Sequence, residues 1–206
     1  MKLLLTAFDP FGGETVNPAQ EALRLLPGRI GAAQLVCRTV PTSFGCCAEV
    51  LRASIEQERP DAVLCIGQAG GRASLTPERM AVNLDDASIP DNDGDMPCDR
   101  PVVPGGPAAY FSTLPIRAMV CAIRAAGIPA EISNTAGTFV CNHLFYSLMH
   151  LLHTSYPAVR GGFLHVPYLP EQAAGKTPQP PSMELSRIVC GLSAAIQAIG
   201  ETGPLS

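Results

Sequence analysis

The sequence predicts an α/β fold, a three-layer α/β/α domain with a mostly parallel, twisted sheet. Short apolar runs rich in Val, Ile and Leu alternate with helical patterns along the chain. Strands buried on both faces read as continuous apolar runs, and parallel strands need helical crossovers. The 206 residues are 47% hydrophobic and 16% charged, which suits one sizeable core and is short for two. We therefore expect a single domain over residues 1–206.

Five apolar runs are the expected strands: 2–8, 34–40, 62–66, 130–133 and 162–166. The opening MKLLLTAF resembles the start of a secretory signal, but its apolar run is shorter than the roughly 7 to 15 residues of a secretory apolar region. It ends at Asp9-Pro10 without a small-residue cleavage site. No apolar run approaches the roughly 18 residues that cross a bilayer. We expect a buried first strand and a soluble, cytoplasmic protein.

Helix starts and stops are marked by capping residues. In Asn17-Pro18-Ala19-Gln20 the asparagine is the expected N-cap, proline fills the first helical position and Gln20 completes a capping box. Four further helices are expected, with these limits: a cap at Ser43 and an end near Glu58, Pro115 to Gly127, a cap at Thr138, and a cap at Ser182 with an end near Gly200.

Residues 67–114 form a long stretch dense in Gly, Pro and Asp. Compact domains rarely contain so much irregular chain without a function for it, and ligands of open α/β sheets bind beyond the carboxyl ends of strands. Part of the stretch, around residues 75–84, is expected to form an extended excursion or an edge hairpin. We expect the stretch to contribute to a site.

Two loops in this stretch resemble ligand-binding motifs but lack their defining residues. The string DNDGD at 91–95 has glycine fourth rather than sixth, and the twelfth position is Val102 instead of glutamate, which argues against a calcium loop. GQAGGR at 67–72 matches neither phosphate-binding glycine pattern. Turn formation explains both loops better, and we expect neither a metal nor a cofactor.

Charge and cysteine usage limit the partners. The net charge is −4 and no run of Lys or Arg occurs, which argues against nucleic acid or an anionic membrane and favours a small or peptide substrate. The eight cysteines contain no C-x-x-C pair. In a chain without an export signal they are expected to be reduced, and most of them to be small apolar residues.

Cys141 is the first candidate nucleophile. It lies in TAGTFVCNHLFYSLM, where a glycine-containing turn passes into an amphipathic helix. The first turn of a helix offers unpaired N–H groups and the positive end of the dipole, both of which favour a thiolate. We therefore expect an activated thiol here.

The base that accepts the thiol proton should be one of four histidines. At about 100° per residue, His143, His150 and His153 point away from Cys141 or lie too far along the helix, and are expected to face solvent. His165 remains, at the end of the last strand, and the sheet topology decides whether it reaches Cys141. The acidic candidates for orienting the imidazole are Glu78, Asp85, Asp86, Asp91, Asp93 and Asp95.

Three phenylalanines at the ends of expected elements, Phe8, Phe11 and Phe139, suggest a binding surface. Core packing explains any one of them. Together at one edge of the sheet they would line an apolar pocket.

Four blocks covering nearly the whole chain resemble the pyroglutamyl peptidase type I (pyrrolidone carboxyl peptidase) family. They read LLLTAFDPFGGETVNP, IGQAGGRASLTPERMAVNLDDASIPDN, SNTAGTFVCNHLFYSLM and RGGFLHVPYLPEQ. The resemblance implies a cysteine peptidase that removes an N-terminal pyroglutamyl residue through a thioacyl intermediate. It also implies N-terminally pyroglutamylated peptides as partners and a homotetramer.

The resemblance assigns residues as well. The nucleophile falls on Cys141, the general base and then acid on His165, and the group orienting the imidazole on Glu78. The ring pocket and its hydrogen-bonding amide fall on Phe8, Phe11, Thr42, Ile89, Phe139, Val140 and Gln68. One position departs from the family pattern: Ser88 in DASIPDN replaces an arginine associated with the reacting carbonyl.

Two other functions remain open at this level. A thiol hydrolase of another small amide, such as a deamidase, would use the same residues. A catalytically silent relative would bind blocked peptides or sense oxidation through Cys46 and Cys47. Retention of Cys141, His165 and Glu78 together argues against the silent relative.

Overall fold

The structure, a computed structural model, describes residues 1–202. Its strands are β1 (Lys2–Phe8), β2 (Arg29–Ile30), β3 (Ala33–Val40), β4 (Ala62–Gln68), β5 (Thr76–Pro77), β6 (Met80–Val82), β7 (Ala109–Phe111) and β8 (Arg160–Val166). Its helices are α1 (Pro18–Leu25), α2 (Cys47–Glu58), α3 (Ile116–Ala125), α4 (Val140–Ser155), α5 (Pro170–Ala174) and α6 (Leu185–Glu201). No helix of this part of the chain is long and apolar enough to cross a membrane.

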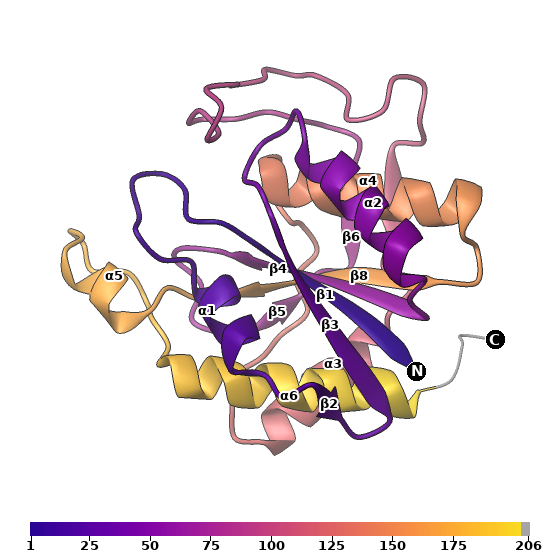
Figure 1. Cartoon of the computed structure of the whole chain (residues 1–206). Helices are drawn as coiled ribbons and strands as arrows, with labels where there is room; N and C mark the ends of the chain where they lie inside the picture. The colour runs from indigo at the N-terminus through magenta and orange to yellow at the C-terminus, as the bar shows by residue number, and fades with distance from the viewer. Residues whose placement is uncertain (203–206) are drawn as a thin grey trace.

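The main sheet has six strands in the order β2-β3-β1-β4-β8-β5. The four long strands run parallel, and the two-residue strands β2 and β5 are antiparallel edges. Helices cover both faces, with α2 and α4 on one side and α1, α3 and α6 on the other (Figure 1). The expected α/β fold with a mostly parallel sheet is confirmed.

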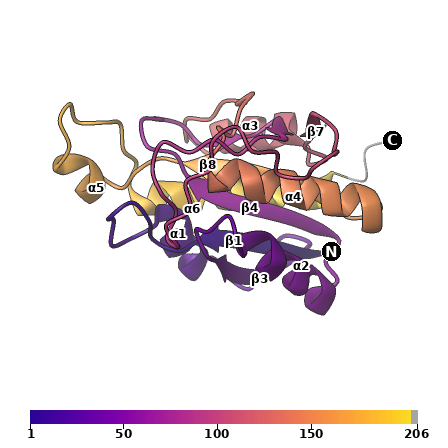
Figure 2. The same cartoon turned by 90° about the horizontal axis from the view of Figure 1, so that it is seen from above.

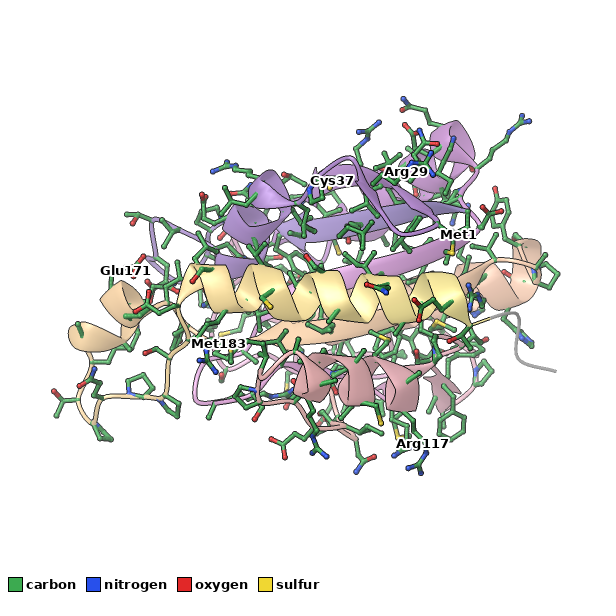
Figure 3. All side chains as sticks on the ribbon, turned by 90° about the horizontal axis from the view of Figure 1, so that it is seen from below. Met1, Arg29, Cys37, Arg117, Glu171 and Met183 are labelled. Carbon is green, nitrogen blue, oxygen red and sulfur yellow. The ribbon has the colours of Figure 1, made fainter. Side chains whose placement is uncertain are left out.

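Two apolar cores follow from alternation along the buried strands. Leu3 and Leu5 of β1 point into the core beneath α1 and α6, whereas Leu4 points into the core beneath α2 and α4. Seen from above, α4 lies along the sheet over β4 and β8 (Figure 2). From below, α6 runs along the sheet beside α3 (Figure 3). Burial on both faces explains the nearly continuous apolar runs of β1 and β4.

The N-terminal cap of α1 is confirmed, since Asn17 Oδ1 accepts from the backbone N–H of Ala19 at 3.0 Å. The expected capping box is not, because Gln20 donates to Thr39 instead. The limits of α3 are also confirmed, with Pro115 as N-cap and Gly127 in the left-handed region (φ 76°) just after the helix.

Three expected caps are wrong. Ser43 donates to Asp93 and Thr138 donates to the Asp86 carbonyl, so both hydroxyls tie down loops while α2 and α4 begin later. Ser182 lies in a single bridge to Tyr168, and α6 begins at Leu185. A side-chain oxygen caps a helix only when no stronger partner takes it, and distant partners cannot be read from local sequence.

The expected strand at 130–133 is also wrong. Ala130 and Ser133 make only isolated bridges, to Leu75 and Glu78. Their neighbour at the sheet edge is the two-residue strand β5, which is too short to continue a ladder.

The excursion expected near residues 75–84 is present in a different form. β5 pairs with β8 at the sheet edge, and β6 then pairs with β7 in a separate two-stranded sheet. Asn142 of α4 holds this excursion in place, because its side chain donates to the Val82 and Leu84 carbonyls and accepts from the Val82 N–H, each at 2.9 Å. The long stretch is thereby fixed over the start of α4.

Candidate active site

Cys141 and His165 meet at the carboxyl edge of the sheet. Helix α4 starts at that edge and returns the chain to the amino end of β8, so its second residue and the end of β8 lie at the same edge. Gly67 is the direct partner of His165 in the ladder between β4 and β8. A Cβ added to Gly67 would lie 2.9 Å from the Cys141 Sγ. The thiol therefore lies over the residue paired with His165.

The Cys141 thiol is buried, and its pKa is not the one expected from its helix position. The cysteine is in the first turn of α4 and 8% exposed. Burial, followed by the charge of Glu78, raises the pKa of the thiol to about 12, and Arg72 only partly opposes this. The expectation of a thiolate in the free protein is therefore wrong. Desolvation of the anion outweighs the favourable helix terminus.

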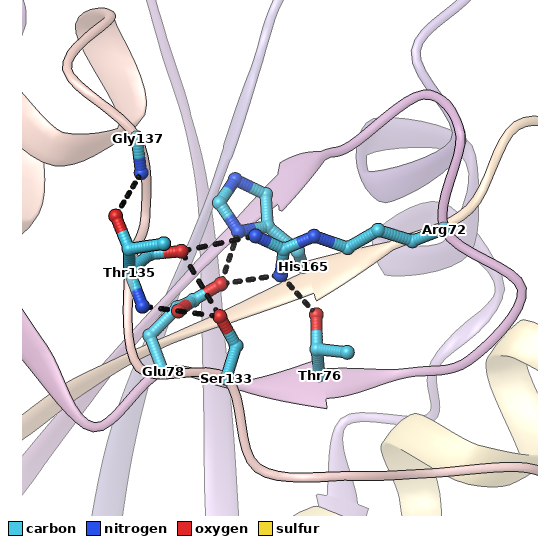
Figure 4. A network of polar contacts seen from close by, with 7 residues as sticks. All are labelled: Arg72, Thr76, Glu78, Ser133, Thr135, Gly137 and His165. Carbon is cyan, nitrogen blue, oxygen red and sulfur yellow. Dashed lines mark hydrogen bonds and ion pairs between the residues drawn. The ribbon is translucent and has the colours of Figure 1, made fainter.

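The His165 imidazole lies at the same edge of the sheet as this thiol and is held by Glu78. Its Nδ1 lies 2.7 Å from the Glu78 Oε1, and the residue is 3% exposed. Burial lowers the pKa of His165 although the Glu78 hydrogen bond opposes the shift, so the ring is neutral at pH 7. An Nδ1–H donated to the carboxylate leaves the other nitrogen, Nε2, as acceptor. That nitrogen points away from Glu78 (Figure 4).

Glu78 is fully buried, and the oxygen that contacts His165 also forms an ion pair with Arg72. Arg72 Nη1 lies 2.6 Å from Oε1, and the guanidinium is held further by the Thr76 hydroxyl and the Thr135 carbonyl (Figure 4). Burial raises the pKa of Glu78, but His165 and the neighbouring polar and cationic groups outweigh burial and lower it below the ordinary value. Glu78 is therefore a carboxylate whose charge Arg72 balances.

Arg72 was not among the residues singled out in the sequence. The sequence feature that could have identified Arg72 is its place at the end of GQAGGR, where an arginine follows a strand and a glycine turn. Only the fold brings that turn beside a buried carboxylate six residues later.

A cavity of about 490 Å³ opens at this edge. Six of the ten residues assigned by resemblance line it: Phe11, Gln68, Ile89, Phe139, Cys141 and His165. The Phe11 and Phe139 rings pack together, with their centroids 5.9 Å apart, and form an apolar wall. Arg72 and Ser88 also line the cavity, so the serine at the departing position faces the space where substrate would bind.

Four assigned residues do not line the cavity. Glu78 lies behind His165, as an orienting group should. Phe8 packs in the core, with its ring centroid 6.5 Å from that of Phe163. Of the three phenylalanines expected to line the pocket, only Phe11 and Phe139 do so. Val140 is fully buried, and Thr42 donates to the Asp9 carbonyl. Binding roles for Phe8, Val140 and Thr42 remain predictions.

The remaining histidines lie elsewhere. His143 contacts Asp85 at 2.8 Å and His150 contacts the Tyr110 hydroxyl at 2.9 Å, so these two are packed rather than facing solvent as expected. His153 is exposed. Within residues 1–202, no group of three or more His, Cys, Asp or Glu side chains could hold a metal ion.

Comparison with known proteins gives a consistent result. The family model described as pyroglutamyl peptidase matches residues 1–202. A pyrrolidone-carboxylate peptidase of Levilactobacillus brevis is 56% identical over 199 residues, covering 97% of each chain. The enzyme of the same name from Streptococcus pyogenes serotype M4 is also 56% identical, over 97% of this chain and 92% of its own.

Solved structures agree with the sequence relatives. The crystal structure of Bacillus amyloliquefaciens pyroglutamyl peptidase I superposes with a TM-score of 0.95 at 50% identity, covering 98% of this chain and 97% of that one. A mutant pyrrolidone carboxyl peptidase from Pyrococcus furiosus superposes with a TM-score of 0.92 at 44% identity, covering 97% of this chain and 98% of that one.

Proposed function

This chain belongs to the pyroglutamyl peptidase family, and we propose that it removes N-terminal pyroglutamyl residues from peptides as a cysteine peptidase. One observation carries the proposal. A buried thiol lies against the strand position paired with His165, whose Nδ1 is held by Glu78, and Cys141 and His165 line a cavity with an apolar wall. That combination supports acyl transfer from a small, uncharged ring.

The reaction begins from neutral partners. His165 Nε2 takes the Cys141 proton as the sulfur attacks the carbonyl that joins pyroglutamate to the next residue. Glu78 stabilises the imidazolium that forms. His165 then gives the proton to the leaving amine, which breaks the amide bond and leaves a thioester on Cys141. A water molecule, deprotonated by His165, attacks the thioester and releases pyroglutamate.

The negative oxygen formed during attack needs donors. The N–H of Cys141 lies in the first turn of α4, where N–H groups have no intrahelical acceptor. One such donor contributes on the order of 3 kcal/mol to transition-state stabilisation. Ser88 stands where the family pattern has an arginine, so this chain relies more on the helix terminus.

Selection of a blocked N-terminus follows from the cavity. The wall of Phe11 and Phe139 suits a flat, uncharged ring, with Gln68 available to hydrogen-bond the lactam. A free N-terminal ammonium held against this apolar wall would lose its hydration without a partner there, at a cost of several kcal/mol.

The test is to offer pyroglutamyl, prolyl and glutamyl amides of one fluorescent amine to the purified protein. Release from the pyroglutamyl amide alone is expected. Equal cleavage of the prolyl amide would overturn the pocket argument, and no release from the pyroglutamyl amide would favour a thiol hydrolase of another small amide.

We also propose a homotetramer in the cytoplasm. The tetramer rests on the family resemblance and is checked by light scattering of the purified protein. A reducing compartment suits a thiol enzyme with four exposed cysteines, Cys37, Cys98, Cys121 and Cys190. Cell fractionation checks the location.

A further inference from the structure

The cavity contains one side-chain amide, and its orientation decides what the site offers to a ligand. Gln68 ends β4, lines the cavity and is 7% exposed. A glutamine amide has a donor end, Nε2, and an acceptor end, Oε1. Which end faces the cavity decides whether the ring must bring a carbonyl or an N–H.

Gln172 of α5, also 7% exposed, has an amide whose direction is fixed by its neighbours. The Leu169 backbone N–H can only donate, and it donates to Gln172 Oε1 at 3.0 Å. The Val16 carbonyl and the Glu14 carboxylate can only accept, and they lie 3.3 and 3.2 Å from Gln172 Nε2. No other orientation of this amide satisfies all three partners.

Gln68 Oε1 lies 3.0 Å from the same Nε2, whose two hydrogens are shared among three acceptors. Gln68 turned the other way would place its Nε2 against this nitrogen, two donors facing each other. The acceptor end of Gln68 is therefore already occupied by Gln172, which does not itself line the cavity. Among the described residues no group accepts from Gln68 Nε2, so the donor end is left for a ligand.

We propose that Gln172 is a positioning residue which, through Gln68, makes the cavity selective for a ring that presents a carbonyl oxygen. The proposal deepens the proposed function and rests on it. The lactam of pyroglutamate has such an oxygen, whereas the proline ring does not and would leave the buried donor unpaired. Capping α5 and tethering residues 14–16 account for the Leu169, Val16 and Glu14 contacts of Gln172, but neither requires its contact with Gln68.

Two small rings test the orientation by direct binding, measured by ligand-observed NMR titration at pH 8. The first, 2-pyrrolidone, carries a carbonyl and an N–H, whereas cyclopentanone carries the carbonyl alone. Gln172→Met keeps the side-chain length but removes both ends of the amide, so Gln68 can rotate. Both rings are expected to bind about fivefold more weakly, the value of one neutral hydrogen bond.

Gln172→Glu is the sharper variant. The new carboxylate still accepts from the Leu169 N–H, so the α5 cap is kept, but it can no longer donate to Gln68. Gln68 then turns its Nε2 toward the carboxylate and presents Oε1 to the ring carbonyl. Binding of both rings is expected to fall roughly tenfold or more, below that of Gln172→Met. The replaced Nε2 lies 3.2 Å from the Glu14 carboxylate, so the variant is also measured as Glu14→Ala/Gln172→Glu, in which two carboxylates no longer face each other. Recovery of parent-like ring binding in this double variant would show that the loss came from charge repulsion and would overturn the inference.

The control is Glu14→Ala, which removes another acceptor of the same Gln172 amide and leaves the Gln68 contact. Its ring affinities are expected to stay within about twofold of the parent protein. For the enzyme, the Gln172 variants should raise KM for a pyroglutamyl amide while kcat changes little.

Unchanged binding of both rings in folded Gln172 variants would overturn the inference. A loss confined to 2-pyrrolidone would also overturn it, since Gln68 would then be accepting from the ring N–H. Failure of the proposed function looks different: the parent protein would bind the rings with the expected order of variants and release no amine from pyroglutamyl amides.

Discussion

Gly67 faces His165 across the parallel ladder, and the space above its Cα is filled by the Cys141 sulfur and the Phe163 ring, each 2.9 Å from where a Cβ would lie. Any other residue at position 67 would displace the nucleophile or the ring. This glycine is therefore needed for the thiol to lie next to the histidine.

Gly67→Ala should reduce activity more than stability. The Cys141 side chain can rotate away from the new methyl group, and overpacking against Phe163 costs roughly 1–3 kcal/mol of unfolding free energy. A thiol displaced by about 1 Å is expected to lower kcat/KM by about 10²-fold. Gly28→Ala, at a glycine with no atom within 4 Å of its Cβ position, is the matched control. It should leave both kcat/KM and the free energy of unfolding unchanged. Thermal unfolding and amine release measure the two effects, and parent-like turnover in Gly67→Ala would contradict the packing argument.

Cys141→Ala should fold like the parent and lower amine release by about 10⁴-fold or more, because no other group can form the acyl intermediate. His165→Ala is expected to behave similarly. Cys98→Ala, at an exposed cysteine, is the control and should keep full activity. Substantial turnover by Cys141→Ala, with folding checked by circular dichroism, would refute the nucleophile assignment.

Glu78→Gln should retain more activity than either of those variants, with a loss of about 10²–10³-fold. The amide can still contact the imidazole, but it cannot balance the imidazolium charge. Since the Glu78 carboxylate raises the pKa of His165, its loss lowers that pKa further. The acid limb of kcat/KM should therefore move to lower pH. A shift to higher pH would contradict the assigned roles.

Arg72→Gln should move the same acid limb in the opposite direction. Arg72 lowers the pKa of His165 and opposes the increase in the pKa of Cys141. Without it the Glu78 charge is uncompensated, so His165 holds its proton to higher pH and the thiol becomes harder to ionise. Activity near pH 6 should fall more than activity near pH 8. Equal losses at both would indicate that Arg72 only supports the fold.

Alkylation of the resting protein tests the protonation state of the thiol. A pKa of about 12 leaves little thiolate at neutral pH, so the rate of Cys141 modification by iodoacetamide should rise about tenfold per pH unit from 7 to 9. Mass spectrometry of the peptide containing Cys141 separates this signal from the exposed cysteines. A rate independent of pH over this range would show a preformed thiolate–imidazolium pair instead.

Local patterns predicted the parts of this protein that depend on neighbours in sequence. The continuous apolar runs identified β1, β3, β4 and β8, and Asn17 and Pro115 identified two helix starts. The helix caps predicted at Ser43 and Thr138 were wrong because these hydroxyls contact residues about fifty positions away. A competition between a local cap and a distant partner cannot be decided from the local sequence.

The sequence by itself determined the fold class, the family and the residue types able to perform the chemistry. Tertiary structure decided which of them meet, because proximity depends on strand order: only with β8 beside β4 does His165 lie next to Gly67, beneath the Cys141 thiol. It also decided the charge states. The dipole that favours a thiolate is visible in the sequence, whereas the burial that outweighs it exists only once the chain has folded around the sulfur.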